Sequence, residues 1–92
     1  MNYKMILQYD GTRYNGWQKQ GNTDNTIQGK LETLLSRIAG EPVEIHGAGR
    51  TDAGVHAAGQ VANAKFHTDL SDEELLQTIN HYLPEDIEVT SL

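Results

Sequence analysis

The alternation of apolar and polar residues along the chain predicts four strands separated by two helices. In residues 4–10 apolar side chains occupy every second position, which is typical of a strand with one buried face. Residues 43–46 show a short version of the same period, and residues 60–66 show a weaker one with small side chains. A last strand is expected from residue 87 to the end of the chain.

The clearest helical pattern covers residues 26–39. Its apolar positions recur with a period near 3.6 residues and are Ile27, Leu31, Leu34, Leu35 and Ile38. Asn25 or Thr26 can supply the N-cap oxygen. Gly40 suits the left-handed position after the helix, and Pro42 prevents the helix from continuing.

A second helix is predicted from Ser71 to Leu83. Ser71 and Glu74 have the spacing of a capping box, and Pro84 ends the helix. The apolar face of this helix is expected to contain Leu75, Leu76, Ile79, Tyr82 and Leu83. The element order β-α-β-β-α-β is that of the α+β ferredoxin-like fold, a four-stranded antiparallel sheet with two helices on one face. We expect residues 1–92 to form a single domain that stops as a fragment of a longer protein would.

Composition excludes several classes of protein. The chain has 92 residues, no cysteine and a net charge of −6, so neither disulfides nor a cysteine-based metal site is possible. No apolar run approaches the length of a membrane helix, and the expected location is the cytoplasm, with no membrane partner. The negative charge has the wrong sign for a nucleic-acid binder. Any contact with RNA must therefore use a local basic patch or protein outside this chain.

Residues 47–59, here called the glycine-rich segment, gather the polar groups with most chemical potential. They contain four of the nine glycines, and Gly47, Gly49 and Gly54 are expected to shape a tight loop. One carboxylate, Asp52, and one guanidinium, Arg50, stand among them. The plainer interpretation is a glycine-rich turn between two strands that carries a solvated ion pair.

Several motifs together carry a family resemblance. They are Tyr9-Asp10-Gly11, Tyr14, Gly16-Trp17-Gln18, Gln28, and the run Gly-Arg-Thr-Asp-Ala-Gly-Val-His-Ala at residues 49–57. In this order the motifs resemble the TruA family of tRNA pseudouridine synthases over essentially the whole chain. The nine-residue run is highly specific, whereas the shorter motifs are weak when taken singly.

The resemblance implies isomerisation of uridine to pseudouridine in the anticodon arm of tRNA. Asp52 matches the family's catalytic aspartate, and a carboxylate can either attack covalently or help drive glycosidic cleavage. Both routes remain open, as does a plain turn-capping role for Asp52. Arg50 matches the arginine that helps hold the target nucleotide out of the helix, with a structural salt bridge as its alternative. No cofactor or metal is implied.

Three further residues are candidates for RNA contact. His56 either faces the RNA or is a satisfied loop histidine. Trp17 either stacks on a base or packs against the first strand. Arg13 is a candidate for a phosphate contact.

The resemblance also implies that a part of the protein is missing. Family members are longer, contain a second, similarly folded half that completes the active cleft, and are expected to be homodimers. We therefore expect these 92 residues to be inactive alone. Three other interpretations remain: an RNA-recognition module, for which the third strand offers only Phe66; an acylphosphate hydrolase using Arg13; and an assembly fragment that pairs through its sheet edge.

Overall fold

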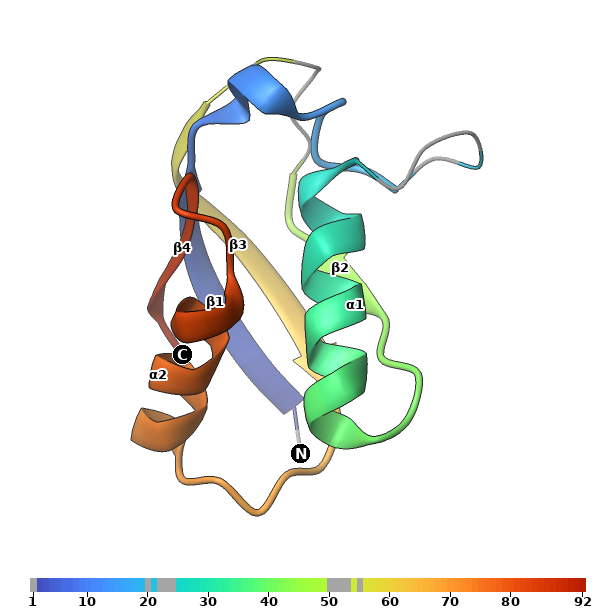
Figure 1. The fold of residues 1–92 in the computed structure, drawn as a ribbon, viewed down its shortest axis with the longest axis vertical. Coiled ribbons are helices and arrows are strands. Elements are labelled where there is room, and N and C mark those ends of the chain that lie inside the picture. The colour runs from blue at the N-terminus through green and yellow to red at the C-terminus, as the bar shows by residue number, and fades with distance from the viewer. Residues whose placement is uncertain (1, 20, 22–24, 50–53, 55) are drawn as a thin grey trace.

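The structure of this chain is a computed structural model that describes residues 2–19, 21, 25–49, 54 and 56–92. Its elements follow the predicted order (Figure 1). They are β1 (Asn2–Tyr9), a short 3-10 turn (Gly11–Arg13), α1 (Ile27–Ala39), β2 (Ile45–Gly47), β3 (Ala57–Lys65), α2 (Asp72–Tyr82) and β4 (Ile87–Ser91).

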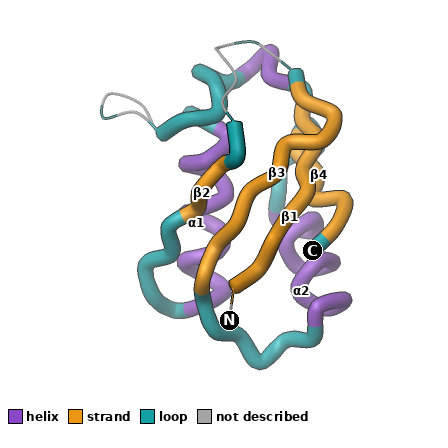
Figure 2. The backbone as a smooth tube through the Cα atoms, turned by 180° about the vertical axis from the view of Figure 1, so that it is seen from behind, coloured by secondary structure: helices purple, strands orange, loops and turns teal. Residues whose placement is uncertain are grey.

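The four strands form one sheet in the order β2-β3-β1-β4, and every neighbouring pair is antiparallel. Both helices lie on the same side of this sheet, and the opposite side is open in the reverse view (Figures 1 and 2). The predicted ferredoxin-like α+β fold is confirmed. Because β1 is central, the first strand pairs with the last two strands of the chain.

The hydrophobic core lies between the sheet and the two helices. Alternate residues of β1, Tyr3, Met5, Leu7 and Tyr9, are buried as the period of two predicts. Small residues of β3 face them: Ala64 lies opposite Tyr3 and Ala62 opposite Met5. The helices contribute the fully buried Leu31, Leu35, Leu75 and Ile79.

The ends of the helices follow the predicted capping chemistry. Thr26 is the N-cap of α1, where its hydroxyl accepts a bond of 3.1 Å from the Gly29 amide. Gly40 has φ 73° at the C-cap, a left-handed conformation that glycine adopts without steric cost. Ser71 and Glu74 form the capping box that starts α2.

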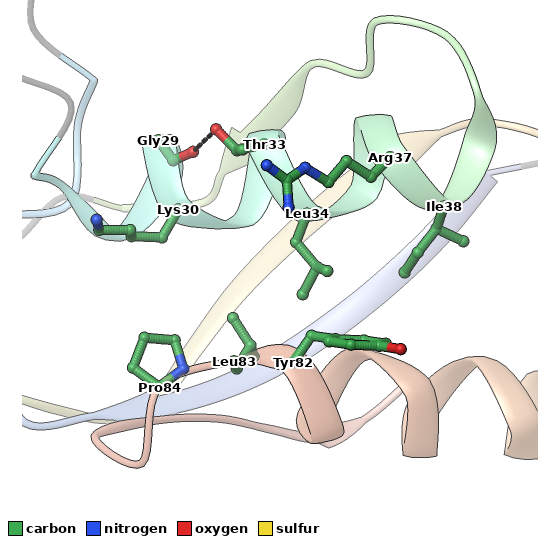
Figure 3. A pocket seen from close by; sticks show the side chains of 9 residues that line it. All are labelled: Gly29, Lys30, Thr33, Leu34, Arg37, Ile38, Tyr82, Leu83 and Pro84. Atoms are coloured by element: carbon green, nitrogen blue, oxygen red, sulfur yellow. Dashed lines mark hydrogen bonds between the residues drawn. The ribbon is translucent and has the colours of Figure 1, made fainter.

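Four expectations need correction. The first strand spans residues 2–9 instead of 4–10, and Asp10 is the N-cap of the 3-10 turn. The second strand lies at residues 45–47 instead of 43–46, although Val43 is buried. The third strand starts at Ala57, so the last three residues of the glycine-rich segment belong to β3, and Ala57 lies opposite Tyr9 of β1. Tyr82 was expected in the core but is 67% exposed, because its ring lies in a groove between the helices and does not reach the sheet (Figure 3).

Candidate functional site

The glycine-rich segment links the end of β2 to the start of β3, at one end of the sheet (Figure 1). Its two principal candidates, Asp52 and Arg50, lie outside the described residues. The structure does place the residues on either side of them. The site is therefore built from the described residues that hold the segment.

Residues 47–49, at the start of the segment, are fixed to β3. The Ala48 amide donates a bond of 2.8 Å to the Val61 carbonyl, which extends the pairing of β2 with β3. The Gln60 side chain then donates a bond of 2.7 Å to the Gly49 carbonyl. Gly49 is thereby held at the position directly before Arg50.

The second half of the segment is fixed to residues 10–14, which follow β1. Gly54 has φ 80°, a left-handed conformation that favours glycine, and its amide donates a bond of 3.2 Å to the Tyr14 carbonyl. Two residues later, His56 Nδ1 accepts a bond of 3.0 Å from the Gly11 amide. Gly54 and His56 are thus both attached to the segment after β1.

His56 Nδ1 has a second neighbour, the Asp10 carboxylate, at 3.1 Å. The two contacts need opposite protonation states, because an unprotonated Nδ1 accepts from Gly11 whereas a protonated Nδ1 donates to Asp10. The Thr12 hydroxyl and then the Thr12 amide are the main groups that lower the pKa of Asp10. The His56 side chain is 63% exposed. His56 is therefore bonded within the loop through Nδ1 and still presents part of its ring to solvent.

Residues 10–14 are in turn attached to the start of β4 through Asp86. The Asp10 amide donates a bond of 2.9 Å to the Asp86 carbonyl. The Tyr14 hydroxyl donates a bond of 2.6 Å to the Asp86 side chain, and Tyr14 is only 6% exposed. Burial, followed by this bond to Asp86, raises the pKa of the Tyr14 hydroxyl far above its usual range. The phenol therefore stays protonated and remains a hydrogen-bond donor to Asp86.

Trp17 is a core residue. It is 2% exposed, and its ring stacks on that of Tyr9 with the ring centroids 6.4 Å apart. The proposed base-stacking role does not fit this burial, whereas packing against the first strand does. The predicted loop-shaping role of Gly47 has a related cause: a Cβ at Gly47 would lie 2.5 Å from Trp17 Nε1.

Arg13 is exposed and is the last residue of the 3-10 turn. It lines a hollow of about 650 Å³ together with Asp10, Thr12, Glu85 and Asp86. A second hollow of about 400 Å³ shares Asp10, Glu85 and Asp86 and includes His56. Carboxylates outnumber cations in both, so this end of the described chain offers little attraction for phosphate.

Sequence reasoning missed two residues that organise this region. Asp86 had no predicted role, and its contact with Tyr14 spans 72 positions along the chain. Gln28 was noted on its helix, but its amide binds the Ile45 carbonyl at 2.7 Å and its oxygen accepts from the Lys19 amide at 2.7 Å. No periodicity or spacing signals such long-range pairs.

Other features of the described residues offer no alternative centre. They contain no group of three or more histidine or acidic side chains placed to hold a metal ion. None of the helices seen in that part of the chain combines the length and apolar character needed to cross a bilayer. The groove of about 510 Å³ between α1 and α2 is lined by apolar side chains and by Lys30 and Arg37 (Figure 3). It contains no carboxylate and no residue of the glycine-rich segment.

Comparison with known proteins identifies relatives of this chain. A family profile described as tRNA pseudouridine synthase matches residues 5–92, which include the whole glycine-rich segment. A protein named tRNA pseudouridine synthase A from Bacillus sp. (strain KSM-64) is 57% identical over 91 residues, which are 99% of this chain and 37% of the relative. A protein of the same name from Thermodesulfovibrio yellowstonii is 48% identical over 92 residues, all of this chain and 36% of the relative.

A third relative, named tRNA pseudouridine synthase A 1, comes from Clostridium tetani and is 62% identical over 68 residues. That match covers 74% of this chain and 27% of the relative. The chain thus spans little more than a third of the length of the relatives that match it throughout. The resemblance seen in the motifs is confirmed: the chain belongs to the tRNA pseudouridine synthase family.

Proposed function

We propose that this chain is the N-terminal, aspartate-bearing part of an enzyme that isomerises uridine to pseudouridine in tRNA. The observation that carries this proposal is the family match over residues 5–92, which runs through the Gly-Arg-Thr-Asp motif at 49–52. The described geometry supports it, because Gly49 is held by β3, whereas Gly54 and His56 are held by residues 10–14 after β1. Catalytic groups work best when a rigid scaffold positions them.

In the proposed reaction Asp52 is the catalytic carboxylate. The bond between C1′ and N1 of uridine breaks, the uracil turns, and a bond forms between C1′ and C5. The proton leaves C5 and N1 gains one, so the product is an isomer and no oxidant or cofactor is consumed. Asp52 acts either as the nucleophile or as the anion that assists glycosidic cleavage.

Arg50 is proposed to hold the target nucleotide outside the tRNA helix. A planar guanidinium can stack on a base and contact a phosphate, which offsets part of the free energy of unstacking. His56 presents an exposed ring edge on the same segment and is proposed to face the RNA. Arg13 is proposed as a peripheral phosphate contact, weakened by the carboxylates around it.

The substrate region is proposed to be the anticodon arm, and the full-length protein is proposed to be a cytoplasmic homodimer. The second half of the protein must supply most of the basic surface, because these residues carry a net charge of −6. An RNA-recognition module is less well supported. The aromatic residues Tyr3, Tyr9 and Phe66 are buried in the core, so they give no stacking platform to the open face of the sheet.

The test is release of tritium from tRNA labelled at C5 of uridine. We expect the full-length protein to release tritium and Asp52→Ala to lose activity by about 1,000-fold or more, since the reacting group is removed. Asp69→Ala, a change at another aspartate, is the matched control and should retain activity. Release by an Asp52→Ala protein at the wild-type rate would refute the role of Asp52. The isolated 92 residues should release none.

A further inference from the structure

A chain of hydrogen bonds joins the start of β4 to the glycine-rich segment. The Tyr14 hydroxyl donates to the Asp86 side chain at 2.6 Å, and the Tyr14 carbonyl accepts from the Gly54 amide at 3.2 Å. Tyr14 is therefore bonded at one end to Asp86, directly before β4, and at the other end to Gly54, two positions after Asp52. No other described residue makes both contacts.

The construction of this link favours rigidity. Tyr14 is 6% exposed, so its ring has little freedom to change rotamer. Its amide also donates to the Gly11 carbonyl at 3.0 Å, which closes the turn on the core side. The Asp86 carbonyl accepts from the Asp10 amide at 2.9 Å, so Asp86 holds both ends of residues 10–14.

The link ends on a residue that needs such support. Gly54 has φ 80° and is exposed. An exposed glycine has many accessible conformations unless its backbone is bonded. The Tyr14 carbonyl supplies the bond, and the Asp86 side chain fixes where that carbonyl lies.

We propose that Tyr14 and Asp86 together position the glycine-rich segment that contains Asp52. Tyr14 binds Gly54, and Asp86 holds Tyr14 in place. This inference rests on the proposed function of Asp52. Tyr14 and Asp86 are positioning residues and not catalytic ones. Their effect is to hold Gly54, and therefore the approach to Asp52, in one arrangement before tRNA binds. A displacement of about 1 Å at a reacting group can lower a rate by about 100-fold.

The test uses the full-length protein and three variants at the pair. Tyr14→Phe removes only the hydroxyl, Asp86→Ala removes the acceptor, and Asp86→Asn keeps an acceptor oxygen. We expect Tyr14→Phe and Asp86→Ala to lower the single-turnover rate about tenfold or more. Asp86→Asn should recover most of that loss. The Kd for tRNA should stay within about twofold of the wild-type value in all three.

Two further measurements separate positioning from general stability and from the proposed function. Tyr82→Phe removes a hydroxyl from an exposed tyrosine of α2 and should change neither rate nor Tm. Hydrogen exchange at the Gly54 amide should become faster in Tyr14→Phe and Asp86→Ala, whatever reaction the enzyme performs. If exchange rises but wild-type protein is inactive on tRNA, the proposed function fails and the link stands as a structural one.

The inference itself is overturned by either of two results. One is an unchanged single-turnover rate in both Tyr14→Phe and Asp86→Ala. The other is a loss of rate that matches the loss of folded protein in each variant, with no recovery in Asp86→Asn. Unchanged exchange at Gly54 in both variants would also contradict it.

Discussion

Contact between a glycine and an indole ring fixes the first turn of the glycine-rich segment. Gly47 is the last residue of β2 and pairs with Ala62. The Trp17 ring covers it so closely that three ring atoms lie within 3 Å of where a Cβ would be. The bent entry to the segment thus depends on the absence of one side chain at residue 47.

Gly47→Ala should therefore destabilise the domain by about 1–3 kcal/mol, because the methyl group forces the buried Trp17 ring to move. Urea denaturation of the 92-residue chain measures this difference. Gly59→Ala is the matched control, since nothing lies within 4 Å of a Cβ there and a strand interior favours alanine over glycine. Equal stability of the two variants would contradict this account of Gly47.

At the residue scale the sequence predicted which residues matter better than it predicted what each of them does. The family motif located Tyr14, Trp17 and His56, but not what each one contacts. Stacking on RNA was an open interpretation for Trp17 because an aromatic ring in a polar loop has the same sequence pattern whether it is exposed or buried. Only the fold, which brings Tyr9 and Gly47 against the Trp17 ring, decides between them.

The elements are joined by a buried carboxylate on α1. Glu32 is 9% exposed, and its Oε2 accepts a bond of 2.9 Å from the Ile45 amide at the start of β2. Its other oxygen lies 2.8 Å from Lys19 Nζ. One side chain therefore connects α1, the edge strand and the loop before the helix.

Glu32→Ala should lower the free energy of unfolding by about 1–3 kcal/mol, because it leaves the buried Ile45 amide without its acceptor. Glu32→Gln keeps an acceptor oxygen and loses only the ion pair with the half-exposed Lys19, so its cost should stay below about 1 kcal/mol. Chemical denaturation compares both with Glu41→Ala, the same deletion at an exposed position. If Glu32→Ala is no worse than Glu41→Ala, the carboxylate is not a structural connector.

The capping box of α2 should make the stability of the domain depend on pH. Its bonds with the Ser71 amide and then with the Ser71 side chain lower the pKa of Glu74 from its ordinary value of 4.5. A carboxylate with a lowered folded-state pKa stabilises above the unfolded value and loses that contribution as pH falls through the folded value. The Tm difference between wild type and Glu74→Gln should therefore be present at about pH 6 and shrink toward about pH 3. Glu73→Gln, in the same turn but without the box, should show less of this change.

Ser71→Ala should cost about 1 kcal/mol at neutral pH, the usual effect of removing an N-cap hydroxyl. Thermal unfolding at about pH 7 measures it. A loss within error of zero would mean that the Glu74 side chain alone starts the helix.

At the element scale the sequence predicted nearly everything except boundaries. Helix caps are local, so Gly40 and Ser71 could be predicted directly from residue types, and Thr26 was one of two candidates with Asn25. Strand ends are set by partners far along the chain. Residues 57–59 belong to β3, where Ala57 pairs with Tyr9 of β1, and no local signal distinguishes them from a loop. Tyr82 was misplaced because the helical period continues to it, whereas its ring lies in the groove between the two helices (Figure 3) and is 67% exposed.

At the scale of the whole molecule, the net negative charge of these residues disfavours binding of tRNA. Thirteen acidic and seven basic residues give a net charge of −6, and carboxylates gather at the end of the sheet near the glycine-rich segment. We expect the isolated 92 residues to bind tRNA at least about 100-fold more weakly than the full-length protein, because phosphate contacts dominate such affinity. Filter binding at a fixed salt concentration measures this ratio. Equal affinity would place the main tRNA surface on this chain.

The central position of β1 has a consequence for synthesis on the ribosome. Its first pairing partner, β3, begins about fifty residues later, and β4 later still. At about 5–20 residues per second, the nascent strand waits roughly 2–10 s for a partner. During that interval the apolar side chains of Met5 and Leu7 are exposed and available to pair with another strand nearby. The polar side chains of Lys4 and Gln8 on the alternate face favour solubility of the nascent segment.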